Sequence, residues 1–480
     1  MNKTLLILCM LMLFLHARAQ RNNQNEINME TLNLTEVWDK TFPKSEKVNH
    51  SKVTFTNRYG ITLAGDLYIP KITTDKLPGI AVCGPYGAVK EQSSGLYAQT
   101  MAERGFITLA FDPSFTGESG GNVREVSSPD INTEDYSAAI DYLISRSDVD
   151  ADRIGIIGIC GWGGIAVSAA VQDTRIKATV SSTMGSFDDF TPEQRYEARK
   201  QINDVRTLIA RGERQDRQKT VPNPCPDDAP DFIKDYYNYY CTPRGYHPRS
   251  VNSGLGWEPT NWIGYFTFPL FAHADEIKSA VLLVHGEKAY SRYASEQTYK
   301  KLTGSNKQLL LIPNASHTDL YDQVNKIPFD RIEKFFQENL EYLKENLKMN
   351  RTLIVYYSHT GTTKRIAQMI QQLTGADIEL TGNLPDLTNY DTILIGGPVW
   401  GQSLSNPLRV LIPLLNLTDK CVSAFWTFED HDEFYDATMR QSTANAKYID
   451  GLSLPQRITN DKQLLDKAIE NWIKTIKTAK

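Results

Sequence analysis

A glycine-rich turn between an apolar strand and a small-residue helix constrains this chain more than any other feature. Residues 153–157 are a β-branched run expected to form a buried strand, and residues 165–171 can pack as a helix close against a sheet. Between them, Gly158-Ile159-Cys160-Gly161-Trp162-Gly163-Gly164 supplies a sharp turn with a thiol at its apex. This order is typical of a nucleophile elbow, which holds a reactive side chain above a sheet.

Two other interpretations of this turn remain open. It could bind phosphate, although its spacing is neither that of a P-loop nor GxGxxG. Cys160 could instead be a buried structural cysteine, and Trp162 stands where an elbow usually has glycine. If the elbow motif were instead aligned with Trp162 at its apex, the apex side chain could not act as a nucleophile. We therefore predict that Cys160 is a nucleophile.

Composition limits the partners of the chain. Its 480 residues suffice for two or more domains, and its net charge of -5 is mixed, which gives no electrostatic case for nucleic acid. Lys3, the apolar run 5–15 and Ala17-Arg18-Ala19 predict a signal peptide over residues 1–19, hence a periplasmic or secreted protein without stable membrane insertion after cleavage. An uncleaved membrane anchor is the alternative.

The order of the predicted elements indicates an α/β protein of two domains. After a polar lead-in over residues 20–50, strands alternate with helices across residues 51–347, which predicts a mostly parallel sheet. Residues 186–276 break this rhythm and are rich in Tyr, Trp and Pro, as expected of a cap over the sheet. Within it, Cys225 and Cys241 could pair in an oxidising compartment. A second α/β unit covers residues 350–480.

A thiol nucleophile needs a base, and the base needs a residue that orients it. The chain order nucleophile, acid, histidine is met by Cys160, Glu287 and His317. His285 is expected to be structural, and Asp319 is the alternative acid. The oxyanion of the transition state needs backbone N–H donors, which we expect from Gly161 and from the early loop at Tyr86 or Gly87. The alternative is that this loop is a turn without a catalytic role.

The elbow, together with His285-Gly286-Glu287-Lys288 and Asn314-Ala315-Ser316-His317, resembles the dienelactone-hydrolase and Xaa-Pro-peptidase-like branch of the α/β-hydrolases over about residues 50–345. The resemblance implies an α/β-hydrolase fold with a cap insertion and a Cys-His-acid triad that hydrolyses an ester, lactone or related acyl bond. It does not transfer a substrate.

Three loops of the second unit indicate a second site. Ser358-His359-Thr360-Gly361-Thr362-Thr363 joins a strand to a helix, and its hydroxyls and amides could hold a phosphate. The loop 396–401 ends in Trp400-Gly401, where a flat ring could stack, and residues 424–429 could form the other wall. These loops resemble those of a flavodoxin over about residues 352–480. The third departs from that pattern at residues 428–432.

The resemblance implies a doubly wound parallel sheet that binds FMN. A protein that transfers electrons through FMN would also need a redox partner. The implied flavin-binding residues are Ser358, His359, Thr360, Gly361, Thr362, Thr363, Pro398, Trp400, Gly401 and Thr427. We expect an exported hydrolase fused to an FMN-binding electron-transfer domain. The alternatives are a flavin redox protein whose hydrolase-like domain only binds ligand, a domain that has lost its flavin, and a scaffold in which neither site turns over.

Overall fold

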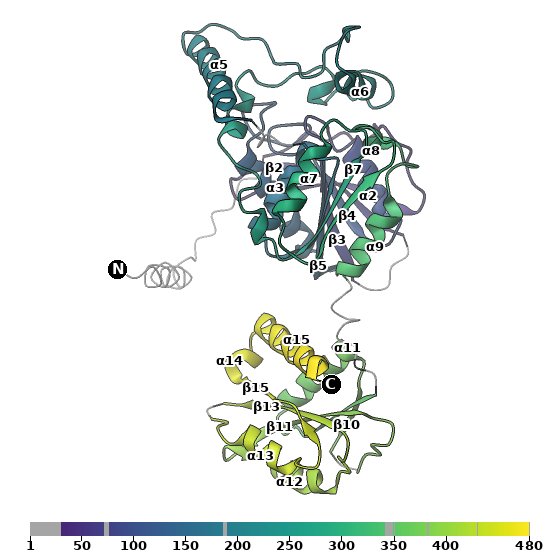
Figure 1. Ribbon diagram of the computed structural model, residues 1–480, viewed down its shortest axis with the longest axis vertical. Helices are drawn as coiled ribbons and strands as arrows, with labels where there is room; N and C mark the ends of the chain where they lie inside the picture. Colours follow the sequence, from purple (N-terminus) through teal and green to yellow (C-terminus); the bar gives the residue numbers. More distant parts are fainter. Residues whose placement is uncertain are drawn as a thin grey trace, which may run out of the picture. The chain divides into compact units, whose positions relative to one another are not determined.

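The chain folds into two compact units, Met1–Leu340 and Glu341–Lys480 (Figure 1). The structure is a computed structural model that describes residues 30–71, 76–185, 190–340, 349, 351–381, 384–429 and 431–479. The expected signal peptide, residues 1–19, lies outside the described residues. Within the described residues, no helix combines the length and apolarity needed to cross a bilayer.

The first unit is built on one eight-stranded sheet of order β1-β2-β4-β3-β5-β6-β7-β8. β1 pairs antiparallel with β2, and β2 antiparallel with β4; the other pairs are parallel. The strands are β1 (Val48–Thr56), β2 (Thr62–Pro70), β3 (Leu77–Cys83), β4 (Ile107–Phe111), β5 (Val149–Ile159), β6 (Ile176–Ser182), β7 (Ala280–Gly286) and β8 (Lys307–Ile312). The mixed sheet and its strand order confirm the predicted α/β-hydrolase fold.

Helices cover both faces of this sheet and form two cores (Figure 1). One core gathers apolar residues of α3 (Pro129–Ser145) and α4 (Gly161–Gln172), and the other those of α2 (Ser93–Ala102) and α9 (Phe329–Leu340). α7 (Arg292–Lys301) and the short α8 (Asp319–Asp322) follow β7 and β8. The central strands β3, β4 and β7 are buried almost throughout, as expected of strands covered on both faces, whereas β8 at the edge is half-buried.

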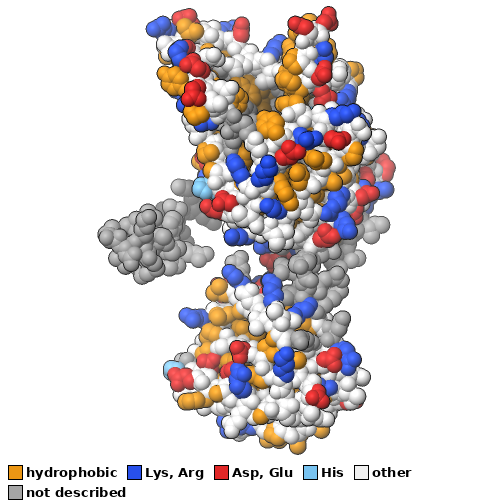
Figure 2. Space-filling model, viewed as in Figure 1, with side chains coloured by type: hydrophobic (Ala, Val, Ile, Leu, Met, Phe, Trp, Pro, Cys, Tyr) orange, Lys and Arg blue, Asp and Glu red, His pale blue; other side chains and the backbone are white. Residues whose placement is uncertain are grey.

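The segment between β6 and β7 forms the predicted cap. It contains α5 (Pro192–Ala210), α6 (Asp231–Tyr240) and three short 3-10 helices, η1 (Val251–Ser253), η2 (Asn261–Phe266) and η3 (Ala274–Glu276). Figure 2 shows the surface hollowed between the two long cap helices, with hydrophobic side chains in the hollow. The cap cysteines Cys225 and Cys241 are free thiols in the structure.

The second unit is a separate parallel sheet with the order β10-β9-β11-β13-β14; β15 also pairs with β13, and β12 pairs antiparallel with β11. Its strands are β9 (Thr352–Tyr356), β10 (Asp377–Leu380), β11 (Thr392–Trp400), β12 (Ser403–Leu404), β13 (Cys421–Phe428), β14 (Lys447–Tyr448) and β15 (Leu452–Pro455). α11 (Thr362–Thr374) and α15 (Lys462–Ala479) contribute to one core, α12 (Asn406–Leu411) and α13 (Tyr435–Ser442) to the other; η4 (Ile412–Leu414) and α14 (Gln456–Thr459) complete it. The flavodoxin-like fold is confirmed.

Candidate active site

Cys160 occupies the apex of a strained turn between β5 and α4. Its backbone angles, φ 58° and ψ -127°, are rare for a residue with a side chain. Gly158 permits this turn, because a Cβ there would lie 2.1 Å from the carbonyl oxygen of Trp162. The strain places the side chain at the carboxyl end of a central strand, beside the N-terminus of α4. This is the elbow geometry that the sequence predicts.

Trp162 does not disturb the elbow, although it replaces the usual glycine. Its ring is buried beneath the turn, in edge contact with Phe111 and tilted against Tyr136. Gly84 makes room for it, because a Cβ at that position would lie 2.7 Å from the Trp162 Cβ. The indole therefore packs into the core while the thiol faces the cap.

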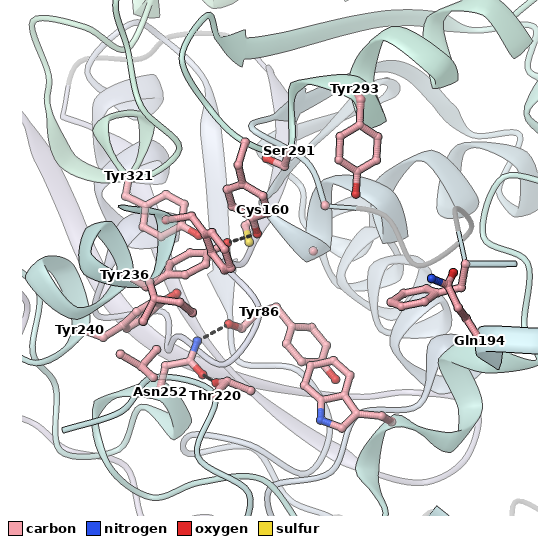
Figure 3. Close-up of a pocket in the computed structure, with 18 residues that line it drawn as sticks. Tyr86, Cys160, Gln194, Thr220, Tyr236, Tyr240, Asn252, Ser291, Tyr293 and Tyr321 are labelled. Carbon is pink, nitrogen blue, oxygen red and sulfur yellow. Dashed lines mark hydrogen bonds between the residues drawn. The ribbon is translucent and has the colours of Figure 1, made fainter. Parts of the chain in front are cut away.

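Cys160 opens into a cavity of about 480 Å³ between the sheet edge and the cap (Figure 3). The volume falls within the usual range for sites of small-molecule ligands. Its walls are mainly aromatic. The described lining residues are Tyr86, Cys160, Gly161, Gly185, Phe190, Gln194, Thr220, Val221, Phe232, Ile233, Tyr236, Tyr240, Asn252, Trp262, Tyr290, Ser291, Tyr293 and Tyr321. Among these residues there is no carboxylate, lysine or arginine.

Burial and hydrogen bonding act in opposite directions on the Cys160 thiol. Burial raises its pKa above the ordinary value, because a thiolate is poorly solvated there. The hydroxyl of Tyr321, the backbone N–H groups of Gly161 and Tyr86 and the hydroxyl of Tyr236 oppose this by hydrogen bonding to the sulfur. Burial has the larger effect, so the resting group is a thiol surrounded by donors.

The N–H groups of two of the three predicted oxyanion residues counteract the rise in the pKa of the Cys160 thiol, which places them near its sulfur. These are Gly161, directly after Cys160, and Tyr86, in the loop after β3. The Pro85 carbonyl accepts a hydrogen bond from the Ala88 N–H at 3.0 Å, which turns the Tyr86 N–H of the same peptide the other way. Gly87 differs from the expectation, because the contact it contributes is its carbonyl, which accepts from the Ser250 hydroxyl at 2.8 Å.

His317 lies at the carboxyl edge of the sheet, after β8, and both its ring nitrogens are hydrogen-bonded. Nδ1 lies 2.7 Å from the Ser291 hydroxyl, and Nε2 lies 3.1 Å from the Tyr321 hydroxyl. Burial, with a smaller contribution from His285, holds the pKa of His317 well below its ordinary value. The imidazole is therefore neutral near pH 7, the form that can accept a proton.

A second buried histidine extends this arrangement. His285 lies at the end of β7, with Nε2 3.0 Å from the Ser291 hydroxyl and Nδ1 2.7 Å from the Ser295 hydroxyl. Burial, and then the charge of Arg292, lower the pKa of His285 to about 3. Two neutral histidines are thus linked through one serine, and the expectation that His285 is structural agrees with its full set of partners.

The predicted acid of the triad is not where the sequence places it. Glu287 is exposed, and its carboxylate accepts a hydrogen bond from the Asn314 backbone N–H at 3.0 Å. The alternative acid, Asp319, binds the Ser316 N–H at 2.8 Å and Lys326 at 2.6 Å. The residue at Nδ1 of His317 is instead Ser291. The Glu287 carboxylate instead holds the backbone of the loop that precedes His317.

Sequence reasoning missed Ser291, Tyr321 and Asn252. Tyr321 follows His317 by four residues, a helical spacing that could have indicated a shared face. Ser291 stands directly before α7, and only the fold brings it to the histidines. Asn252 comes from the cap and donates its side-chain amide to the Tyr86 carbonyl at 2.8 Å (Figure 3). For Ser291 and Asn252, no local sequence pattern indicates the role.

Residues 59–319, more than half of the chain, match the family described as X-Pro dipeptidyl-peptidase (S15 family). The chain belongs to the S15 family. Residues 353–448 match a flavodoxin domain. The site above lies within the S15 domain, apart from Tyr321, which follows the matched segment by two residues.

Relatives match mainly the S15 part. Uncharacterized protein PA2218 of Pseudomonas aeruginosa is 52% identical over 335 residues, 68% of this chain and 90% of that protein. Its crystal structure, titled as a hypothetical protein, has a TM-score of 0.61 and covers 65% of this chain and 99% of that one. Uncharacterized protein YcjY of Escherichia coli is 32% identical over 61% of this chain and 99% of its own. Thiohydrolase aneE of Aspergillus aculeatus is 31% identical over 28% of this chain and 42% of its own.

The flavodoxin unit of this S15-family protein has its own cavity, of about 470 Å³, at the carboxyl ends of its strands. Seven predicted cofactor residues line it: His359, Thr360, Thr362, Pro398, Trp400, Gly401 and Thr427. The other three lie in the same phosphate-type loop. Ser358 accepts from the Gly361 N–H at 3.2 Å, and the hydroxyl of Thr363 lies 3.0 Å from that of Thr427.

The rest of this second cavity is lined by the neighbours of Trp400, by the third loop, which the sequence predicts as a wall, and by the segment after β15. Its lining residues beyond those above are Val399, Gln402, Phe428, Glu429, His431, Gln456, Thr459 and Asn460. Trp400 keeps 37% of its surface exposed, with the rings of Tyr357 and His359 edge-on to it. Trp426, in contrast, stacks on Tyr435 in the core, so the third loop presents Phe428 and Glu429 instead.

Proposed function

We propose that the S15 domain is a cysteine-dependent acyl hydrolase that acts on an uncharged, largely apolar ester, lactone or thioester. The observation that carries this proposal is Cys160 at the apex of a strained elbow, opening into the cap cavity. The backbone N–H groups of Gly161 and Tyr86 counteract the rise in the pKa of its thiol. A thiol with oxyanion donors beside a neutral buried histidine is the equipment of acyl transfer. The relative aneE is named a thiohydrolase, which agrees with this bond class.

The walls of the cavity favour an uncharged acyl group over a dipeptide. An X-Pro peptide presents a charged amino terminus, and burying it requires a carboxylate partner. The described lining residues contain no carboxylate, whereas Phe232, Trp262 and Tyr293 offer aromatic surface. An aromatic or medium-length aliphatic acyl chain would remove this surface from water, at about 25 cal/mol for each Å² buried.

In the proposed reaction, Cys160 attacks the substrate carbonyl as its proton moves toward His317. The N–H groups of Tyr86 and Gly161 stabilise the oxyanion that forms. The protonated His317 then gives its proton to the leaving oxygen or sulfur, and a thioester to Cys160 remains. Water, deprotonated by His317, releases the acid and restores the thiol.

A panel of p-nitrophenyl esters tests this proposal on the purified full chain. We expect Cys160-dependent hydrolysis that increases from acetate to hexanoate or benzoate, and an X-Pro-anilide to be a poor substrate. Cys160→Ala should lower kcat/KM by about 10³-fold or more. Equal rates for wild type and Cys160→Ala would overturn the proposal and leave the domain as a ligand-binding module.

We also propose that the flavodoxin unit binds FMN. The residues present fit this group: the loop before α11 offers hydroxyls and a helix N-terminus for a phosphate, and Trp400 offers an exposed ring face for a flat one. A bound flavin would supply one- or two-electron transfer to a redox partner. Flavin absorbance of the protein, or fluorescence quenching on titration with FMN, checks this; a colourless protein that takes up no FMN would have lost the cofactor.

We further propose export to the periplasm or beyond, with cleavage before Gln20. The basic start, the apolar run and Ala17-Arg18-Ala19 support it. N-terminal sequencing of the mature protein after fractionation of the cells that make it would show Gln20 as the first residue. An intact Met1 in the soluble cytosolic fraction would contradict export.

A further inference from the structure

The proton of the Cys160 thiol has no direct route to the proposed base. Among the residues that the structure describes, no hydrogen bond joins the Cys160 sulfur to His317. Nδ1 of His317 is bonded to Ser291, and Nε2 is bonded to the Tyr321 hydroxyl. Tyr321 also lines the cavity into which Cys160 opens, and interaction with its hydroxyl counteracts the rise in the pKa of the Cys160 thiol. One oxygen atom therefore stands between the nucleophile and the base.

We propose that the Tyr321 hydroxyl carries the proton from the Cys160 thiol to Nε2 of His317. As the sulfur attacks, its proton passes to the Tyr321 oxygen while the tyrosine's own proton passes to Nε2. The sulfur is then bonded to the former carbonyl carbon of the tetrahedral intermediate, the imidazole has become imidazolium, and the tyrosine is unchanged. The same path returns a proton to the thiolate when the acyl group leaves. The inference rests on the proposed role of Cys160 as a nucleophile.

The neighbouring tyrosine cannot replace it. The Tyr236 hydroxyl also bonds to the sulfur, but its other partner is the Tyr290 hydroxyl at 2.8 Å. That path leads to another phenol and not to a base. Burial keeps the pKa of Tyr321 well above its ordinary value, so its hydroxyl stays protonated and can relay a proton without resting as an anion.

The serine and histidine behind His317 complete the relay. When Nδ1–H of His317 donates to Ser291, the serine hydroxyl donates to Nε2 of His285, whose Nδ1–H donates to Ser295. In this polarisation Nε2 of His317 keeps its lone pair and accepts from Tyr321, whose hydroxyl donates to the sulfur only after the thiol proton has moved. The tautomers follow from the network, since hydrogens are assigned from their partners. Ser291 is a positioning residue that takes the place of the expected carboxylate.

Tyr321→Phe in the full chain removes the relay atom and keeps the ring, which packs on His317 and Tyr239 with centroids 5.5 and 4.9 Å away. The matched control is Tyr239→Phe, which removes a hydroxyl from the adjacent ring, outside the cavity lining. We expect Tyr321→Phe to lower kcat/KM by about 100-fold, within the range of general acid–base contributions, and Tyr239→Phe to change it by less than about threefold.

A second readout follows the thiol without any turnover. Alkylation of Cys160 by iodoacetamide, read by mass spectrometry of its peptide, should slow about tenfold at pH 8 in Tyr321→Phe, the equivalent of one pKa unit, because the thiolate loses a donor. Wild-type kcat/KM and alkylation in Tyr321→Phe would overturn the relay, as would equal losses in both variants. If wild type shows no Cys160-dependent hydrolysis, the proposed function fails, and alkylation alone decides the relay.

Discussion

At the scale of single residues, the site consists of a thiol and an imidazole that are both uncharged at rest. Burial raises the pKa of Cys160 and lowers that of His317. A buried thiolate–imidazolium pair would need compensation for the desolvation of both ions. The structure offers hydrogen-bond donors to the sulfur but a serine, not a carboxylate, to the imidazole. Proton transfer and attack are therefore expected in one step.

This charge state determines the pH dependence of the reaction. Because the pKa of His317 lies well below 6.5, its basic form persists as the pH falls, so kcat/KM for a neutral ester should stay level from pH 7.5 to below pH 6. Because the pKa of Cys160 is raised above 9.0, alkylation by iodoacetamide should keep increasing beyond pH 9. A kcat/KM profile that halves near pH 6.5, or alkylation complete by pH 7, would contradict this charge state.

At the scale of elements, the cap holds a loop that follows a strand of the sheet and lines the candidate site. η1 of the cap supplies Asn252, whose amide donates to the Tyr86 carbonyl at 2.8 Å and whose backbone N–H donates to the Gly87 carbonyl at 3.2 Å. The oxygen of Asn252 in turn accepts from the Thr220 hydroxyl at 2.6 Å. The loop that contains Tyr86, whose N–H is the proposed oxyanion donor, is thus oriented by a segment far along the chain.

Asn252→Ala should therefore weaken transition-state stabilisation more than ground-state binding. We expect kcat to fall by about tenfold or more, toward the 10²–10³ typical of a lost oxyanion donor, with KM changed less. The control is Asn339→Ala, which loses a similar amide-to-carbonyl bond, to Phe335 at 2.8 Å, in α9. Steady-state kinetics on the preferred ester measures both; equal effects of the two substitutions would refute a specific role of the cap.

A buried cluster of charged side chains holds the segment that directly follows the Tyr86 loop. The Lys90 ammonium is fully buried, 2.7 Å from the carboxylates of Asp112 and Glu118 and 2.8 Å from that of Glu91. Lys90→Met leaves the buried Asp112 carboxylate without its ammonium partner, while Glu91 and Glu118 keep Lys52 at 3.0 and 2.5 Å. It should lower the free energy of unfolding by about 3–5 kcal/mol. Lys200→Met, at an exposed pair with Asp204, should change the free energy of unfolding far less, because water and salt screen an exposed pair. Urea unfolding measures both, and similar values would contradict the argument.

The elements that sequence predicts best are those whose side chains carry a burial pattern. The strand before the elbow is an apolar run that ends in glycine, and it lies within β5, where residues 153–157 predict it. The short parallel strands β14 and β15 carry no such run and are not predicted. Helix α5 gave no such signal, because only Ile202 of its residues is buried, although Thr191 and Gln194 form a capping box at its start. The missed site residues, Ser291 and Asn252, act through tertiary contacts that no local period encodes.

At the scale of the whole molecule, two sites share one chain but not one core. In the described residues, each hydrophobic cluster takes its members from a single unit: two within Met1–Leu340 and two within Glu341–Lys480. Each cavity is likewise lined by residues of one unit. Substitutions without shared partners usually have additive effects. The two proposed activities should therefore be separable by single changes.

In the full chain, Trp400→Ala should weaken FMN binding by about 10- to 100-fold, because it removes an exposed ring face worth about 1–3 kcal/mol in stacking with a flat heterocycle. Ester hydrolysis should stay within about twofold of wild type. Cys160→Ala should abolish ester hydrolysis and leave FMN binding unchanged. Fluorescence titration with FMN and ester kinetics on the same preparations measure both, with Trp426→Phe, a ring buried in the core, as the tryptophan control. Loss of hydrolysis in Trp400→Ala, or of FMN binding in Cys160→Ala, would mean that the sites are coupled and that the fused flavin regulates acyl transfer.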